Sequence, residues 1–137
     1  IINSGGGAIS SGFAIYDTIQ MLRAPVRTVG AGLIASMGVT IFLAAKKENR
    51  YSLANSRYMI HQPLISGTVV APASDVEINA REMIKLRDRL NTLIAESSGQ
   101  PLSKVETDTQ RDYWMAADEA QEYGIVGKVV AQWTDLQ

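Results

Sequence analysis

The sequence predicts a single α/β domain with a largely parallel sheet. Short apolar segments typical of strands alternate with segments whose apolar residues recur at helical spacing, which favours parallel strands joined by right-handed crossovers. Of the 137 residues, 46% are hydrophobic and 20% are charged, which suits one globular domain with its own core. Four prolines and no low-complexity stretch leave no candidate linker between domains.

Four short strands are predicted in the N-terminal half of the chain. They are Ile1–Asn3, Val26–Val29, Arg50–Leu53 and Tyr58–Ile60. Two helices are predicted between them. Ile9–Leu22 repeats apolar residues on one face and ends before Pro25, whereas Ser36–Lys47 is mostly apolar and is therefore expected to be buried.

A long amphipathic helix is predicted from Asp75 to Ser97, after a segment that contains Pro72, and Ser98-Gly99 offers a C-cap. Its apolar residues fall on one stripe, which comprises Met83, Ile84, Leu86, Leu90, Leu93 and Ile94. A helix of about six turns is too long for so small a domain to cover. We therefore expect its apolar face to contact another subunit, with packing onto its own domain as the alternative.

Composition excludes several classes of function. A net charge of −1 provides no basic surface for nucleic acid. The absence of cysteine excludes disulfides and thiolate metal sites, and one histidine makes a catalytic zinc site improbable. The apolar segments are too short to span a bilayer, and no signal peptide is visible. We therefore expect no cofactor, no metal, and neither a nucleic-acid nor a membrane partner.

Ser36 and His61, the only histidine, form a candidate nucleophile and base. Ser36 lies between an apolar segment of strand character and one of helical character. A hydroxyl there points out of the sheet, beside free N–H groups at the start of the helix. Neutral imidazole suits proton abstraction from serine near pH 7. Because Ile34 occupies the first glycine position, Gly-x-Ser-x-Gly is only half matched, and a structural histidine at a strand end is the alternative.

The run Gly5-Gly-Gly7 follows the first predicted strand and precedes the first predicted helix. A phosphate-binding loop would occupy that place. However, the run lacks the lysine of a P-loop, and Gly5-x-Gly7-x-x-Ser10 matches only two of the three dinucleotide glycines. Phosphate binding therefore stays the lesser alternative for this loop.

Eight blocks of the sequence resemble those of the ClpP family, the proteolytic subunits of the ATP-dependent Clp protease, in the same order and near the same spacing. They are Asn3-Ser-Gly-Gly-Gly7, Ala14-Ile-Tyr-Asp-Thr18, Ala35-Ser-Met-Gly38, Asn55-Ser-Arg57, Met59-Ile-His-Gln-Pro63, Ala80-Arg-Glu82, Asp108-Thr-Gln-Arg-Asp112 and the segment Glu119 to Gly124. The resemblance runs from the first residue to about Val130. It implies a ClpP/crotonase-type fold of repeated β-β-α units, as one protease domain over residues 1–137 with a projecting strand-helix handle at about 64–97.

The resemblance also implies the roles of three side chains. Ser36 would be the nucleophile, His61 the general base and acid, and Asp112 the carboxylate that orients the imidazole. Asp112 is selected by the family motif alone, since Asp75 or Asp108 would be comparable choices without it.

By the same resemblance, the backbone N–H groups of Gly7 and Met37 would form the oxyanion hole. Arg111, Gln110 and Leu90 would contribute to oligomerisation. The family usually has proline at the position of Gly5 and often an acidic residue at that of Gln110, and the segment from Leu64 to Asp75 is about two residues longer here. The chain is also expected to lack an N-terminal segment of the family.

The function implied is that of a serine endopeptidase subunit that hydrolyses unfolded polypeptides. Its partners would be a Clp-type ATPase unfoldase and further copies of itself in stacked heptameric rings, in a bacterial cytoplasm or an organelle stroma or matrix. Two alternatives are a non-catalytic structural ring subunit and a crotonase-type acyl-CoA enzyme, which resembles ClpP in fold and also uses backbone oxyanion donors.

Overall fold

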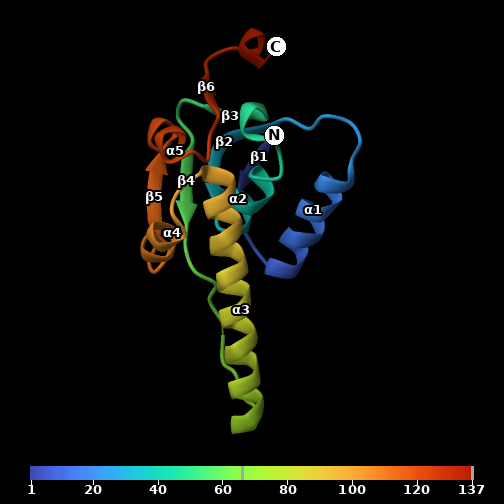
Figure 1. Ribbon diagram of the computed structural model, residues 1–137, viewed down its shortest axis with the longest axis vertical. Coiled ribbons are helices and arrows are strands. Elements are labelled where there is room, and N and C mark those ends of the chain that lie inside the picture. The colour runs from blue at the N-terminus through green and yellow to red at the C-terminus, as the bar shows by residue number, and fades with distance from the viewer. Residues whose placement is uncertain (66, 137) are drawn as a thin grey trace.

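The computed structural model describes residues 1–65 and 67–136, so Ser66, inside the predicted handle, and Gln137 lie outside the described residues. Within this part, six strands form one sheet with helices packed around it (Figure 1). The elements are β1 (Ile2–Ser4), α1 (Ile9–Met21), β2 (Thr28–Ala35), α2 (Met37–Phe42), the 3-10 helix η1 (Lys47–Asn49), β3 (Arg50–Leu53), β4 (Arg57–Ile60), α3 (Ala73–Ser98), α4 (Leu102–Asp108), β5 (Tyr113–Ala116), α5 (Ala117–Tyr123), β6 (Lys128–Val130) and the 3-10 helix η2 (Trp133–Leu136).

β2 is the centre of the sheet because it pairs with three other strands. Gly30 is opposite both Ile2 of β1 and Ser52 of β3, whereas Ile34 is opposite both Ser4 of β1 and Tyr58 of β4. β3 and β4 therefore follow one another along the same edge of β2, and the sheet curls. These pairings and that of β3 with β6 are parallel, and only β4 and β5 pair antiparallel among the described strands. The predicted largely parallel sheet is confirmed.

Most predicted elements lie within about two residues of their observed bounds, and two differ by more. The strand expected at Val26–Val29 extends to Ala35, because pairing with β1 and β4 continues past Gly30. The helix expected at Ser36–Lys47 begins one residue later and already ends at Phe42. The carbonyl of Phe42, the last residue of the helix, accepts from Thr28 Oγ1 at 3.0 Å instead of continuing the helical pattern, and just beyond the helix Ala44 O accepts from Gln20 Nε2 at 2.9 Å.

The core lies between the sheet and helices α2, α3 and α5. Its largest fully buried side chains include Tyr58, Phe42, Ile34, Ile60 and Met115. The rings of Phe42 and Tyr58 meet edge to face, with their centroids 5.5 Å apart. These residues come from β2, α2, β4 and β5, so the core fixes the ends of the strands on which the candidate site is built.

α3 divides into a packed half and a projecting half, as Figure 1 shows. From Leu90 to Ser98 most side chains are buried against the domain, whereas those before Leu90 are mainly exposed. The helix ends at Gly99, which adopts the left-handed conformation expected of the C-cap. The long helix predicted at Asp75–Ser97 is thus confirmed as an element, with one half on its own domain.

The strand expected before this helix is not formed in the described part of the segment, residues 62–65 and 67–72. Pro63 and Pro72 have no backbone N–H to donate, and Gly67 has a left-handed φ of 88°. A strand here would also need a neighbouring strand to pair with. None of the described helices is both long and apolar enough to cross a membrane.

Candidate active site

Ser36 lies at the junction of β2 and α2 in a strained backbone conformation. Its φ of 56° and ψ of −125° make it the one described residue other than glycine with a positive φ. Such a conformation costs about 1–3 kcal/mol and persists only where the surroundings enforce it. Here Ser36 N donates to Met59 O at 2.8 Å, and Ser36 O accepts from Val39 N at 3.0 Å. The predicted place of Ser36, between strand and helix, is correct.

His61 reaches Ser36 because β4 runs parallel to β2 and beside it. Ala35 is opposite Met59, so both strands end at the same edge of the sheet. His61 Nε2 lies 2.9 Å from Ser36 Oγ, within hydrogen-bond distance. The imidazole is mostly buried, with 18% of its side chain exposed. A neutral ring with Nε2 unprotonated accepts the serine proton in this geometry.

Asp112 reaches the other side of the imidazole from β5, which pairs antiparallel with β4. Because Ile60 is opposite Tyr113, the residues one step beyond, His61 and Asp112, face one another. The distance from Asp112 Oδ1 to His61 Nδ1 is 3.2 Å. The Asp112 side chain is 60% exposed. The three side chains form a chain of contacts with the imidazole in the middle.

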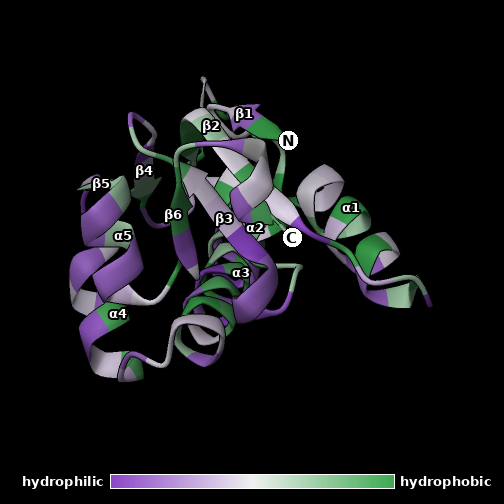
Figure 2. Ribbon diagram, turned by 90° about the horizontal axis from the view of Figure 1, so that it is seen from above, coloured by the Kyte–Doolittle hydropathy of each residue, from purple (hydrophilic) through white to green (hydrophobic). Residues whose placement is uncertain are grey.

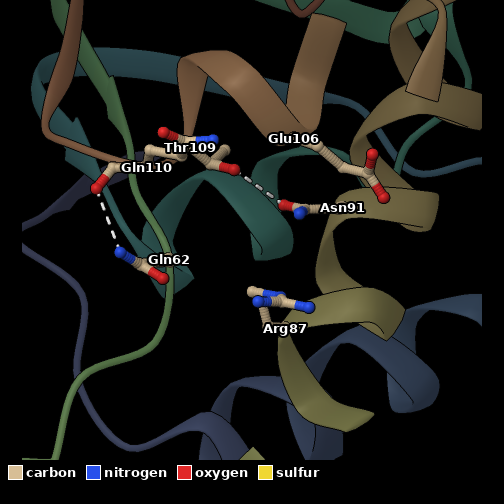
Figure 3. Close-up of a pocket in the computed structure, with 6 residues that line it drawn as sticks. All are labelled: Gln62, Arg87, Asn91, Glu106, Thr109 and Gln110. Atoms are coloured by element: carbon tan, nitrogen blue, oxygen red, sulfur yellow. Dashed lines mark hydrogen bonds between the residues drawn. The ribbon is translucent and has the colours of Figure 1, made fainter. Parts of the chain in front are cut away.

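The loop that carries Asp112 is tied to the segment after His61. Gln62 N donates to Thr109 O at 2.7 Å, and Gln62 Nε2 donates to Gln110 O at 3.0 Å. Thr109 Oγ1 in turn donates to Asn91 Oδ1 of α3 at 3.0 Å (Figure 3). Sequence reasoning missed these supporting residues. The one signal was the position of Gln62, next to His61 within a recognised block.

A polar pocket of about 260 Å³ lies beside these supporting hydrogen bonds. Arg87 and Glu106 complete its lining with the four residues just named, as Figure 3 shows. Asn91 of α3 and Thr109, which hydrogen bond to one another beside this pocket, are both buried, so the segment before Asp112 is anchored on α3.

The glycine loop passes close to Ser36 on the side away from His61. Gly6 has a left-handed φ of 97°, and a Cβ there would lie 2.6 Å from Ser36 Cβ. Only glycine fits at this approach. Gly6 N donates to Ser4 Oγ at 3.1 Å, so the loop folds around the nucleophile. The N–H groups of Gly7 and Met37 make no backbone hydrogen bond in the described part of the chain. This placement gives the phosphate-loop alternative no support.

An apolar cavity of about 30 Å³ adjoins Ser36 and His61. The other lining residues are Ile9, Met37, Thr40, Ile60, Pro63, Leu90 and Ile94. Leu90 therefore differs from its expected place at a subunit contact: it is only 7% exposed in the single chain and faces the cavity. The reason is that, over the second half of α3, the apolar stripe faces the core of its own domain.

Among the described residues, the side chains of the remaining candidates make no hydrogen bond to Ser36, His61 or Asp112, although the backbone carbonyl of Gln110 accepts from Gln62. Gln110 and Arg111 are exposed on the loop before Asp112. Asp75 is in the first turn of α3, on its projecting half. Asp108 accepts hydrogen bonds from Lys104 Nζ at 2.7 Å and Tyr123 Oη at 2.8 Å, so it serves another contact.

Asp108 also changes the titration of its two partners. The hydrogen bond to Asp108 raises the pKa of Lys104, and burial together with Asp108 raises that of Tyr123. Asp108 is thus already engaged in an ion pair with Lys104 and a hydrogen bond with Tyr123. Within the described residues, no group of three or more acidic or histidine side chains is placed to hold a metal ion.

The chain is similar to known proteins over nearly its whole length. The Clp protease family model matches residues 1–133. The chain is 49% identical over 135 residues to an ATP-dependent Clp protease proteolytic subunit 2 from Treponema pallidum, covering 98% of this chain and 67% of that protein. It is 45% identical over 135 residues to a proteolytic subunit 3 from Rhizobium etli, covering 98% and 69%.

A solved structure is also similar, a mutant of ClpP1 from Listeria monocytogenes. The TM-score is 0.89 at 46% sequence identity, over 99% of this chain and 74% of that one. This similarity confirms the ClpP-type fold expected from the sequence resemblance.

Proposed function

Because this chain belongs to the Clp protease family, we propose that Ser36, His61 and Asp112 form the catalytic triad of its serine peptidase activity. One observation carries the proposal: His61 lies between the other two, 2.9 Å from Ser36 Oγ and 3.2 Å from Asp112 Oδ1. This is the geometry in which a carboxylate fixes the imidazole tautomer and the imidazole activates a hydroxyl.

The reaction proceeds in two steps at Ser36. His61 Nε2 takes the proton of Ser36 Oγ as that oxygen bonds to a peptide carbonyl carbon, and the developing oxyanion is stabilised by the N–H groups of Gly7 and Met37. The C–N bond then breaks, and His61 returns the proton to the leaving amine. Water, deprotonated by His61, hydrolyses the acyl-enzyme and restores Ser36.

The apolar cavity beside Ser36 supports a substrate side chain of apolar character. Ile60, Leu90 and Ile94 present only carbon atoms to it from their side chains, so a charged group there would lose its hydration without a partner. Unfolded polypeptides are the substrate class that we propose, because they expose such side chains in an extended backbone.

Members of this family form rings and associate with Clp ATPases. For this chain we propose stacked heptameric rings in which the predicted handle, residues 64–97, joins the two rings. Exposed large apolar side chains on α1 and on the projecting half of α3 support this assembly. They include Ile15, Met21, Val76, Ile78 and Ile84. An ATP-driven unfoldase would deliver substrate, and the bacterial relatives favour a bacterial cytoplasm over an organelle stroma or matrix.

Neither alternative function has a specific observation in its favour. The relatives are named as Clp protease proteolytic subunits, not as acyl-CoA enzymes. A non-catalytic ring subunit would not need a histidine in contact with both a serine and an aspartate. Nor would it need the strained backbone conformation of Ser36.

Replacing the nucleophile tests the function directly. Ser36→Ala should lower the hydrolysis of a small fluorogenic peptide roughly 10³-fold or more, because the covalent step is lost. Ser103→Ala, at an exposed site on α4, is the matched control and should keep wild-type turnover. Wild-type turnover in Ser36→Ala, with intact assembly in both variants, would show that the nucleophile is another group.

The assembly is tested on the projecting half of α3. Ile84 is 49% exposed in the single chain, so Ile84→Asp should leave the fold intact and weaken ring pairing, where the carboxylate would be buried unpaired. Asn79→Asp adds the same charge at an exposed polar position of the helix and should assemble normally. Analytical ultracentrifugation measures both, and unchanged assembly of Ile84→Asp would place the ring contact elsewhere.

A further inference from the structure

Helix α1 packs on α2 at the surface of the domain, with most of its side chains exposed or only partly buried. Of its thirteen described residues only Gly12 is buried, although Phe13 and Tyr16 pack partly against the core. Figures 1 and 2 both show α1 set apart from the sheet, on the side opposite α4 and α5, and Figure 2 shows hydrophobic stretches along it. The contact at Gly12 is therefore where α1 is most deeply buried, and Gln20 Nε2 adds a hydrogen bond to Ala44 O at 2.9 Å near the other end of the helix.

Gly12 packs directly on the side chain of Met37, the residue after the nucleophile. A Cβ at position 12 would overlap Met37 Cε, and it would also lie 3.1 Å from Met37 Cβ and 3.3 Å from Cγ. Met37 is only 4% exposed, and the cavity that it lines beside Ser36 measures only about 30 Å³, so its flexible end can move but its Cβ and Cγ atoms stay close to position 12. Any residue larger than glycine must therefore shift α1, Met37, or both.

Both proposed oxyanion donors are attached to this contact. Met37 carries one donor on its own backbone. Gly7 carries the other, two residues before α1 begins at Ile9, and the first turn is closed by Gly12 N donating to Ala8 O at 3.0 Å. Ile9 and Met37 also line the same cavity beside Ser36. A displacement of α1 thus moves the two donors relative to one another.

We propose that Gly12 is a positioning residue, which sets the geometry of the oxyanion hole by allowing α1 to pack directly on Met37. The proposal rests on the roles of Gly7 and Met37 proposed above. Oxyanion donors act at 2.7–3.1 Å from a charge that develops only in the transition state. A shift of well under 1 Å therefore lowers the rate of the chemical step and leaves ground-state binding of substrate nearly unchanged.

The test is steady-state kinetics of Gly12→Ala on a fluorogenic peptide, with Ser11→Ala, an exposed neighbour on α1, as the matched control. We expect kcat of Gly12→Ala to fall roughly ten- to hundred-fold with KM changed less than about three-fold, at unchanged oligomeric state. Ser11→Ala should match the wild type. Wild-type kcat in an assembled Gly12→Ala protein would overturn the proposal.

A second variant identifies the contact itself. Gly12→Ala combined with Met37→Val removes the overlapping methyl group, so kcat should recover at least partly relative to Gly12→Ala alone. If Gly12→Ala does not fold, Met37→Ala alone decides: removing the contact from the other side should lower kcat about ten-fold, and wild-type kcat would refute the proposal.

Failure of the proposed function is recognised separately. In that case the wild-type protein itself would lack peptidase activity that depends on Ser36, whatever stands at position 12.

Discussion

The two sides of Ser36 are built differently. On the side of His61, two parallel strands end together in the core, and the residues before Ser36 and His61, Ala35 and Ile60, are both 1% exposed. On the other side, one proposed oxyanion donor, Gly7, lies in the exposed glycine loop before α1, and the other, Met37, lies at the start of α2, where Gly12 of α1 packs against it. The sheet thus fixes the positions of the nucleophile and its base. The proposed oxyanion hole depends also on the glycine loop and on α1, which are mostly exposed to solvent in the single chain.

Because of this difference, we expect folding and assembly to determine different parts of the site. Folding of the chain suffices to place His61 against Ser36, because both follow paired strands. In the assembly proposed above, another subunit would cover α1 and so add contacts to this helix and to the glycine loop before it. We therefore expect the pairing of Ser36 with His61 to be insensitive to assembly, and the oxyanion geometry to respond to it.

Asp112 is intermediate, since β5 sets its register but its side chain is exposed. Asp112→Asn should lower kcat/KM roughly 10²–10⁴-fold, because an amide that donates to Nδ1 favours the wrong imidazole tautomer. Peptidase kinetics measure the loss, with Asp17→Asn on the exposed face of α1 as the control for removal of a carboxylate. If Asp112→Asn and Asp17→Asn had equal activities, Asp112 would not be a member of the triad.

The glycine loop allows a smaller and more local test. Gly6→Ala combines a left-handed φ with a Cβ 2.6 Å from Ser36 Cβ, so the loop must move away and kcat should fall roughly ten- to hundred-fold. Gly5→Ala is the matched control, because its φ is not left-handed and its Cβ would only contact Leu33 Cδ2 at 3.9 Å.

Gly5→Ala should keep its activity and gain about 0.4–1 kcal/mol in unfolding free energy. Kinetics and thermal unfolding of both variants decide. If Gly5→Ala and Gly6→Ala lost activity equally, general loop flexibility would matter rather than the close approach at Gly6.

Patterns in the sequence predicted those elements of the fold that depend mainly on residues close to one another in the chain. The long helix, the short strands Arg50–Leu53 and Tyr58–Ile60 and the place of Ser36 follow from periodicity and turn residues. The end of α2 at Phe42 could not be predicted, because the carbonyl of Phe42 bonds to Thr28, which is distant in sequence.

Less of the candidate site could be predicted from sequence patterns. The contact of Ser36 with His61 was expected from the residue types, but Asp112 could be chosen only through the family motif, since the pairing of β5 with β4 is a tertiary event. Leu90 faces the cavity beside Ser36, and Gly12 lies against Met37. Both contacts depend on how the elements pack together, which the spacing of apolar residues in the sequence does not reveal.

The central claim, that His61 activates Ser36, is tested most directly by covalent labelling with a fluorophosphonate probe and peptide mass spectrometry. The claim predicts one label per chain, located on Ser36, and little labelling of the folded His61→Ala variant, in which the base is missing. Labelling of a different serine, or undiminished labelling of Ser36 in His61→Ala, would contradict it.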